Sequence, residues 1–267
     1  MNKHIKTKEN VICVVGLGYV GLPLAESLSK YFKVIGFDVD KKKIEKLQNT
    51  YNDLQLTSNS KDIKKANFII IAVPTPVTNH KESDMSYLIK AGETVGENLS
   101  KGSVVVLEST VYPSATEEAL VPILEEKSSL TIGSDFKIGY SPEMINPGDK
   151  INILGNITKI ISGMDKETVY LLEKVYSKIV NVYKAENIRT AEAAKVIENI
   201  QRDLNISLMN ELSIIFNKMR WILNLACSKR SLLDISIKSK MTFEKIKKAS
   251  DILYSKDLIS KSIEGQL

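Results

Sequence analysis

One short segment near the start of the chain limits its possible folds more than any other. Residues 12–28 read ICVVGLGYVGLPLAESL, in which the apolar run 12–15 is typical of a strand and the residues from 22 onward have helical spacing. Gly16, Gly18 and Gly21 lie on the turn between them and match the pattern G-x-G-x-x-G. The first glycine allows a tight turn, the second a close backbone approach to a pyrophosphate, and the third close packing of helix and strand. The segment therefore predicts a strand, a phosphate-binding loop and a helix.

An acidic residue follows at the distance that such a loop requires. Asp38 ends the apolar run 34–37 and lies 22 positions after Gly16, close to the offset at which an acid accepts the ribose hydroxyls of NAD. A carboxylate at this place repels the 2′-phosphate of NADP, so the pattern predicts NAD as the cofactor. The alternative is that Asp38 only caps a helix beginning near Lys41.

The length and composition are those of a globular protein. A chain of 267 residues is long enough for one large domain or two ordinary ones, and its mean hydropathy is −0.09. The longest apolar run, residues 68–73, is too short to cross a bilayer, and the first ten residues contain no signal-peptide stretch. We therefore expect a cytoplasmic protein without a membrane partner.

Cysteine and charge patterns exclude two further classes. Cys13 and Cys227 lie far apart without C-x-x-C spacing, so we expect neither a metal site nor a disulfide framework. The net charge of +5 is uneven: residues 218–267 carry 11 Lys and Arg against 5 Asp and Glu, whereas residues 1–217 carry 26 against 27. Because this neutral body has no basic stripe with interleaved aromatics, we expect no nucleic-acid partner.

Strand-like and helix-like periods alternate through most of the chain. The predicted strands are 11–15, 33–37, 67–73, 103–107 and 137–140, with helical stretches near 21–31, 40–48, 84–99 and 115–126. A further unit follows, with strand-like 157–163, helix-like 165–178 and strand-like 179–183. The alternation predicts an α/β fold with a Rossmann-type, doubly wound parallel sheet over residues 10–185.

A long helix is predicted next. Residues 190–219 contain no Gly or Pro and would form a helix of about 45 Å. Ile197, Leu204, Leu208 and Ile215 fall on one side of it, interrupted by Glu211. The opposite side carries polar residues, several of them Asn, with only Ile206 among them: Lys195, Asn199, Arg202, Asn210, Ser213 and Asn217. This polar side is either a solvated face or one that lines a site or a helix contact.

Five segments together resemble the UDP-glucose/GDP-mannose dehydrogenase family. They are GLGYVGLPLA at 16–25, VPTP at 73–76, ESTVYPSAT at 108–116, YSPEMINPGDK at 140–150 and AAKVIENIQRDLNISLMNEL at 193–212. The resemblance covers roughly residues 10–219. The pattern SPE-x-INPGD is most similar to that of the branch that oxidises UDP-N-acetylhexosamines for capsule or O-antigen polysaccharides.

The resemblance implies an activity and a set of site residues. Family members oxidise the sugar C6 alcohol to a carboxylate with two NAD and do not release the aldehyde. The implied cofactor-binding residues are Gly16, Gly18, Tyr19, Val20, Gly21, Asp38, Lys43, Pro74, Thr75 and Thr110. The implied partners are the UDP-sugar and a second copy of the chain, which forms a homodimer through the long helix.

The chemistry explains the implied catalytic residues. Hydride loss from an alcohol leaves negative charge on oxygen, and Lys195 and Asn199, spaced i and i+4, offer a cation and an amide donor from one helix face. Glu143 matches the family's carboxylate that orients water, and Thr110 is expected near the nicotinamide. Singly, these residues could be a surface Lys–Asn pair, a turn glutamate and a helix-capping threonine. Jointly, in family order, they predict a site.

The sequence departs from the family at two places. Met144 follows Glu143 where the branch usually has Arg, which puts one charged contact in doubt. The second oxidation needs a cysteine thiolate, but residues 220–267 contain no glycine-rich GGHC segment, and the neighbours of Cys227 do not match one. The divergent tail, residues 221–267, fits a truncated or frameshifted gene product, a hypothesis that resequencing tests.

The combined prediction is an NAD-binding domain at 10–185, a long helix and the start of a helical central domain at 186–220, and the divergent tail. The inferred parent activity is UDP-sugar 6-dehydrogenation, impaired here because the cysteine region is missing. Two alternatives remain: a non-catalytic NAD or nucleotide-sugar-binding remnant, and a Rossmann dehydrogenase of the 3-hydroxy acid type.

Overall fold

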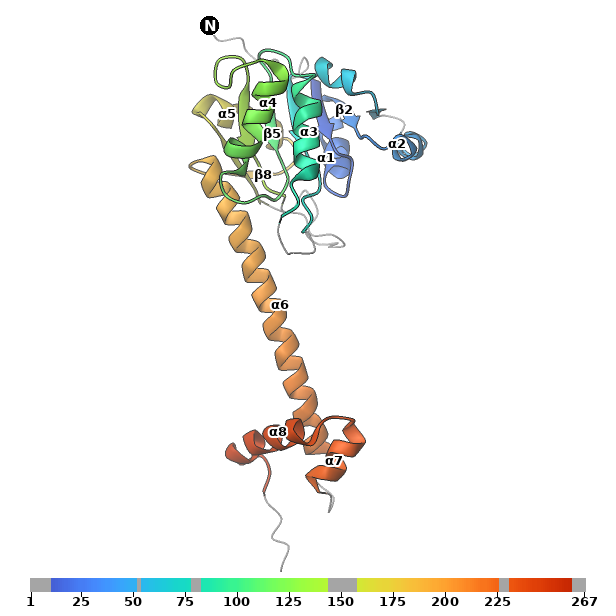
Figure 1. The fold of residues 1–267 in the computed structure, drawn as a ribbon, viewed down its shortest axis with the longest axis vertical. Helices are drawn as coiled ribbons and strands as arrows, with labels where there is room; N and C mark the ends of the chain where they lie inside the picture. Colours follow the sequence, from blue (N-terminus) through green and yellow to red (C-terminus); the bar gives the residue numbers. More distant parts are fainter. Residues whose placement is uncertain (1–10, 52–53, 78–82, 144–157, 226–230, 261–267) are drawn as a thin grey trace, which may run out of the picture. The chain divides into compact units, whose positions relative to one another are not determined.

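The computed structural model describes residues 11–51, 54–77, 83–143, 158–225 and 231–260 (Figure 1). The chain divides into two compact units, Met1–Ile197 and Glu198–Leu267, and each is described by itself. Within the described residues, no helix combines the length and the apolar character needed to cross a bilayer.

The first unit is built on one sheet. Its strands are β1 (Val11–Val15), β2 (Lys33–Phe37), β3 (Gln55–Thr57), β4 (Phe68–Ile71), β5 (Val104–Leu107), β6 (Lys137–Tyr140), β7 (Thr158–Gly163) and β8 (Asn181–Lys184). Their order in the sheet is β3-β2-β1-β4-β5-β6-β7-β8, and all neighbours are parallel except β6 and β7. The first six strands thus have the doubly wound order that the alternation of periods predicts.

Helical segments connect the strands. They are α1 (Gly21–Ser29), α2 (Lys41–Gln48), the 3₁₀ segment η1 (Ser60–Lys65), α3 (Ser86–Gly96), the π-type segment η2 (Thr116–Leu120), α4 (Val121–Ser128) and α5 (Lys166–Tyr176). The long helix α6 (Ile188–Leu225) then crosses from the first unit into the second, which also contains α7 (Leu232–Ser239) and α8 (Phe243–Ser255).

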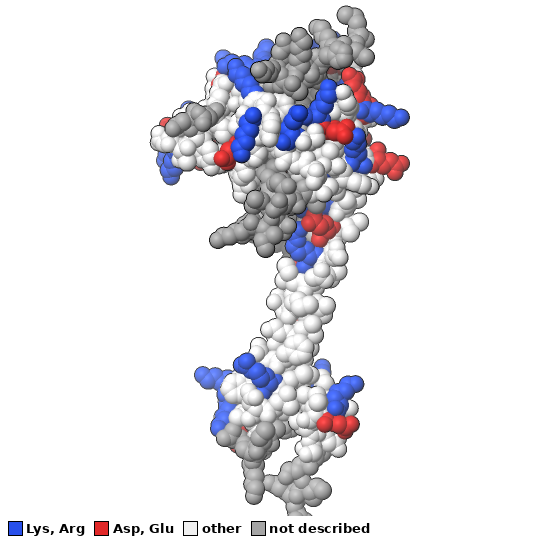
Figure 2. Space-filling model, turned by 180° about the vertical axis from the view of Figure 1, so that it is seen from behind, with Lys and Arg blue, Asp and Glu red and all other residues white. Residues whose placement is uncertain are grey.

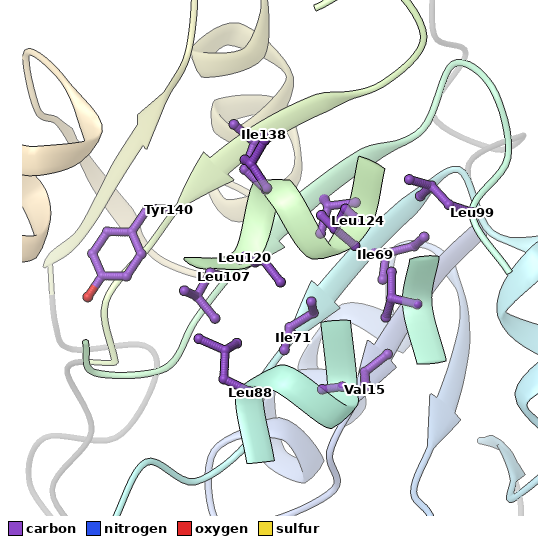
Figure 3. Packing of buried hydrophobic residues seen from close by; sticks show 14 of the residues in the cluster. Val15, Ile69, Ile71, Leu88, Leu99, Leu107, Leu120, Leu124, Ile138 and Tyr140 are labelled. Carbon is purple, nitrogen blue, oxygen red and sulfur yellow. The ribbon is translucent and has the colours of Figure 1, made fainter. Parts of the chain in front are cut away.

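Alternating strand residues form two cores, one on each face of the sheet. Cys13 and Val15 of β1 belong to a cluster that includes Leu88 of α3 and Leu124 of α4 (Figure 3). Ile12 and Val14 belong to the other cluster, together with residues of α1 and α5. Strands that are buried on both faces consist of apolar residues. The polar residues of the motifs therefore lie in the loops at the strand ends.

The structure differs from the sequence predictions in several details. β3 and η1 were not predicted, and β7 runs antiparallel to β6, pairing Gly139 with Gly163. An antiparallel neighbour does not require a crossover helix, so the strand period alone could not give its direction. The helix predicted near 115–126 begins as η2 and ends at Ser128, and the long helix extends over 188–225.

Candidate active site

The glycine loop joins the carboxyl end of β1 to α1. Gly16 has a φ of +95°, and a Cβ there would lie 2.6 Å from the carbonyl oxygen of Ala72. A Cβ on Gly21 would lie 1.9 Å from the carbonyl oxygen of Gly16. A Cβ on Gly18, in contrast, would meet no heavy atom within 4 Å. The fold therefore requires the first and third glycines, whereas the second borders open space.

The start of α1 suits an anion. Val20 precedes the helix without a side-chain cap, and the first turn contains no acidic residue. The positive end of the helix dipole is consequently not offset by a protein carboxylate there. Together with the open space at Gly18, this arrangement fits the pyrophosphate of NAD.

Asp38 lies directly beside this loop, at the end of β2. Its Oδ2 accepts hydrogen bonds from the Leu17 N–H at 3.0 Å and from the Lys43 Nζ at 2.7 Å, and its Oδ1 accepts one from the Asp40 N–H. Partial burial alone would raise the pKa of Asp38, but these hydrogen bonds hold it below its ordinary value. The cap of α2 is Asp40, which accepts from the Lys43 N–H. Asp38 is therefore an ionised carboxylate held at the sheet edge, and the simple helix-cap interpretation does not apply to it.

The loops after β4 and β5 are fastened to each other. Thr75 Oγ1 donates to the carbonyl oxygen of Thr110 at 2.6 Å, and Ser109 Oγ donates to the carbonyl oxygen of Val73 at 2.5 Å. Pro74, between these contacts, is exposed. Pro74, Thr75 and Thr110 thus lie at the carboxyl ends of adjacent strands, the edge at which open α/β sheets bind ligands.

Glu143 is a buried carboxylate just beyond the end of β6. Its Oε2 accepts a hydrogen bond from the hydroxyl of Tyr19 at 3.1 Å, whereas its buried Oε1 has no hydrogen-bond partner among the described residues. Burial raises the pKa of Glu143 to about 7, although Tyr19 and the charge of buried Lys195 act in the opposite direction. A carboxyl group with such a pKa can exchange a proton near neutral pH.

A buried ionic network lies behind Glu143. Lys159 Nζ donates to Glu108 and, at 3.2 Å, to the carbonyl oxygen of Pro142. The other carboxylate oxygen of Glu108 accepts from the Tyr176 hydroxyl at 2.8 Å. The Lys159 and Glu108 side chains are only 4% and 2% exposed. The network therefore anchors the backbone next to Glu143 to β5, β7 and α5.

Glu192 of α6 performs a similar task for the loop after β5. Its carboxylate accepts from the backbone N–H groups of Ser114 and Thr116 and from the Thr116 hydroxyl. Glu192 is fully buried, and Lys195 lies one turn later on the same helix. This contact fixes the beginning of α6 against the loop that carries Thr110.

The structure brings many of the predicted site residues to one edge of the sheet. The glycine loop, Asp38, Thr75, Thr110 and Glu143 follow the carboxyl ends of β1, β2, β4, β5 and β6. Lys195 reaches Glu143 electrostatically from α6. Asn199 is exposed and belongs to the second unit, so its part in the site stays a prediction. Met144 and Cys227 lie outside the described residues.

Sequence reasoning missed the supporting residues Glu108, Lys159, Tyr176 and Glu192. Glu108 lies inside the ESTVYPSAT segment and Glu192 directly precedes the AAKVIENIQRDLNISLMNEL segment, so both lie in or next to a family motif. Lys159 is a charged residue within an apolar strand, and this unusual position was the available signal for a buried ion pair. Within the described part of the chain, no group of His, Cys, Asp and Glu is arranged to hold a metal ion.

The strand order, the glycine loop and Asp38 define a dinucleotide-binding domain of the Rossmann type. Residues 10–55 and 49–180 match the model of the UDP-glucose/GDP-mannose dehydrogenase family, NAD binding domain. The chain belongs to this family, and the resemblance inferred from its motifs is confirmed. A second model, a winged helix-turn-helix, matches residues 204–261.

Individual relatives are similar over the same part of the chain. A UDP-N-acetyl-D-glucosamine 6-dehydrogenase of Salmonella typhi is 52% identical over 224 residues, which are 78% of this chain and 53% of that protein. The corresponding enzyme of Pseudomonas aeruginosa is 47% identical over 228 residues. The solved UDP-D-ManNAc dehydrogenase of Pyrococcus horikoshii has a TM-score of 0.71 at 33% identity and covers 78% of this chain and 54% of that chain. This chain spans about half the length of the relatives it matches.

Proposed function

We propose that this chain binds NAD and a UDP-N-acetylhexosamine in the manner of a nucleotide-sugar 6-dehydrogenase. The parent activity is oxidation of the sugar C6 hydroxyl to the uronate for capsule or O-antigen polysaccharides. The observation that carries the proposal is the convergence of the glycine loop, Asp38 and Glu143 at one sheet edge, where Tyr19 joins the loop to Glu143. The identity with UDP-N-acetyl-D-glucosamine 6-dehydrogenases supports the substrate class. We place this function in the cytoplasm, where nucleotide sugars are made.

The residues divide the work by their chemistry. Bound NAD supplies the hydride acceptor. Asp38 holds the adenosine ribose, with Lys43 beside it, and the start of α1 holds the pyrophosphate. Lys195 stabilises negative charge on the C6 oxygen, with Asn199 one helical turn further on as an amide donor. Glu143, with a pKa of about 7, holds or releases a proton next to the reacting carbon and orients water.

We further propose that this 267-residue chain completes little or no oxidation to the uronate. That step requires a thiolate that forms a thiohemiacetal and then a thioester. Cys13 is buried inside β1, and burial raises its pKa to about 12. Cys227 has neighbours foreign to the family's cysteine loop. Cys13 therefore lacks the environment of a reactive cysteine, and Cys227 lacks the sequence neighbours of this family's cysteine loop.

The test is an assay of the purified chain with NAD and UDP-N-acetylhexosamines, followed by mass spectrometry of the sugar product. We expect bound NAD with little or no NADH and no uronate. Formation of the uronate with two NADH per sugar would overturn the proposal of impaired chemistry. In that case Cys227→Ser would show whether Cys227 acts as the nucleophile. Failure to bind NAD at all would overturn the proposed function itself.

A homodimer through α6 is the proposed assembly. Large apolar side chains on the middle of α6 are exposed: Ile200, Leu204, Ile206, Leu208, Met209, Ile214 and Phe216. Between Asp203 and Lys218 the only charged residue is Glu211, and the face of the helix seen in Figure 2 is uncharged along its middle. An uncharged apolar helix surface of this kind is buried in a stable protein, and the same helix of a second copy is the partner that we propose.

A further inference from the structure

The second unit has a hydrophobic core of its own. Ile222 from the end of α6, Ile235 of α7, and Ile246, Ala249 and Leu253 of α8 form a buried cluster that shares no residue with the two clusters of the sheet. All five of these side chains are at most 5% exposed. The end of α6, α7 and α8 are therefore a separately packed three-helix module.

The connection between α7 and α8 is a defined tight turn. Ser231 and Asp234 form a capping box at the start of α7. At its end, Lys240 adopts the left-handed region with a φ of 55°, and the Met241 N–H donates to the carbonyl oxygen of Ser236. The Ser236 hydroxyl donates back to the carbonyl oxygen of Met241 at 2.6 Å. Two helices joined by a three-residue turn have the element order of a helix-turn-helix, and they lie within the range 204–261 that matches the winged helix-turn-helix model.

This module coincides with the positive charge of the chain. The matched range 204–261 contains 11 Lys and Arg and 5 Asp and Glu, whereas the rest of the chain contains 26 and 27. Around the turn, the side chains of Lys238, Lys240, Lys245, Lys247 and Lys248 are all exposed. Figure 2 shows Lys and Arg side chains on the surface of this unit. A basic module on an otherwise neutral chain is the electrostatic footprint of a polyanion-binding site.

We propose that the second unit binds double-stranded DNA, with α8 entering the major groove and exposed lysines of α7 and α8 contacting phosphates. The B-form major groove admits an α-helix, and a helix-turn-helix presents its second helix there. The deep, narrow major groove of double-stranded RNA does not admit one, so the fold favours DNA. The expectation that no nucleic acid binds rested on the neutral body, residues 1–217, and the proposal replaces it for the tail.

The proposal also gives the divergent tail a different meaning. The tail encodes a capping box, a tight turn and a packed core in succession, which we do not expect of a frameshifted segment. The helix-turn-helix is independent of the NAD site, because its core and its charge lie in the second unit. Loss of one activity therefore does not predict loss of the other.

The test uses the whole chain and a labelled mixed-sequence DNA duplex of about 30 base pairs, followed by fluorescence anisotropy at several salt concentrations. We expect binding with a dissociation constant in the micromolar range that weakens steeply as salt rises. Replacing Lys245→Gln together with Lys248→Gln should weaken binding at least about tenfold and reduce the slope of log affinity against log salt by about 2.

A matched control separates this site from general attraction to a polyanion. Lys61→Gln together with Lys64→Gln removes two exposed lysines at the same i, i+3 spacing on η1 of the first unit. This control should leave DNA affinity unchanged, and both double variants should keep their NAD affinity. Absence of DNA binding by the unmodified chain, equal losses in both double variants, or equal affinity for an RNA duplex would each overturn the proposal.

Discussion

Tyr19, in the glycine loop, donates a hydrogen bond of 3.1 Å to Glu143, which lies 124 residues later in the chain. The contact ties the loop that follows β1 to the carboxylate that follows β6. It stabilises the ionised form of Glu143, whereas burial favours the protonated form. The state of this carboxyl group near neutral pH therefore depends on a residue of the cofactor loop.

Replacing Tyr19→Phe should raise the pKa of Glu143 above its value of about 7, because the variant removes a hydrogen bond to the ionised carboxylate. An infrared or carbon-13 pH titration of labelled glutamate follows this group, and Glu143→Gln identifies its signal. Tyr31→Phe, at an exposed tyrosine outside the site, is the control. An unchanged or lowered pKa in Tyr19→Phe would show that the hydrogen bond does not govern Glu143.

The raised pKa of Glu143 makes stability depend on pH. The folded pKa of about 7 exceeds the ordinary value of 4.5, so the folded state binds the proton more tightly than the unfolded state. The stabilising contribution is fully present below pH 4.5 and is lost as the pH rises through 7. Relative to Glu143→Gln, the unmodified chain should become less stable between pH 5 and pH 8, roughly the span of this titration. Denaturant unfolding of both proteins measures this difference, and parallel pH profiles would refute the assignment.

The same substitution at two glycines of the loop should affect two different properties, stability at Gly21 and NAD affinity at Gly18. Gly21→Ala places a Cβ 1.9 Å from a carbonyl oxygen and should lower the free energy of unfolding by about 2 kcal/mol or more. Gly18→Ala meets no neighbouring atom and should leave stability nearly unchanged. It should nevertheless weaken NAD binding at least about tenfold, because the added methyl group occupies the place of the pyrophosphate. Calorimetry and unfolding of both variants distinguish the two effects.

Removing only one partner of the buried ion pair between Glu108 and Lys159 should lower the free energy of unfolding strongly. Lys159→Met leaves the buried Glu108 carboxylate without its cation and should cost about 3–5 kcal/mol of unfolding free energy. Adding Glu108→Gln, which still accepts from Tyr176, should recover part of this loss. Lys137→Met, which breaks more exposed ion pairs with Asp165 and Glu167, should cost less than about 1 kcal/mol. Equal losses in the two Lys→Met variants would contradict a special role for the buried pair.

Light scattering tests the proposed dimer. The unmodified chain should be a dimer at micromolar concentration. Leu204→Glu with Leu208→Glu puts two charges on the exposed apolar side of α6 and should raise the dissociation constant at least about tenfold. Tyr31→Glu with Tyr170→Glu, which puts two charges on exposed tyrosines of the first unit outside α6, is the control and should have little effect. If the unmodified chain is entirely monomeric at micromolar concentration, the proposed dimer is contradicted.

Much of the first unit could be predicted because its signals are local. Strands such as 11–15 and 33–37 are short apolar runs, and the glycine spacing with Asp38 is a motif with a known backbone requirement. β3 has only three residues, and the direction of β7 is set by its partner strand, so neither left a local signal. The pairing of Glu108 with Lys159 joins residues 51 positions apart and follows only from the folded chain.

The helices α7 and α8 of the second unit were not predicted, for a specific reason. A turn between two helices is normally recognised by glycine, but the left-handed position at the end of α7 is Lys240. The eight-residue helix α7 is also too short to give a clear period. The sequence therefore presented a basic Ser- and Lys-rich tail rather than two short helices joined by a turn.

The most direct test of the central claim is calorimetric titration of the purified chain with NAD and with NADP. The account predicts one NAD per chain and affinity for NADP at least about tenfold weaker, a difference of about 1.4 kcal/mol. Asp38→Asn should narrow this difference, because it removes the charge that repels the 2′-phosphate. Absence of NAD binding, or NADP binding that equals or exceeds that of NAD, would contradict the account.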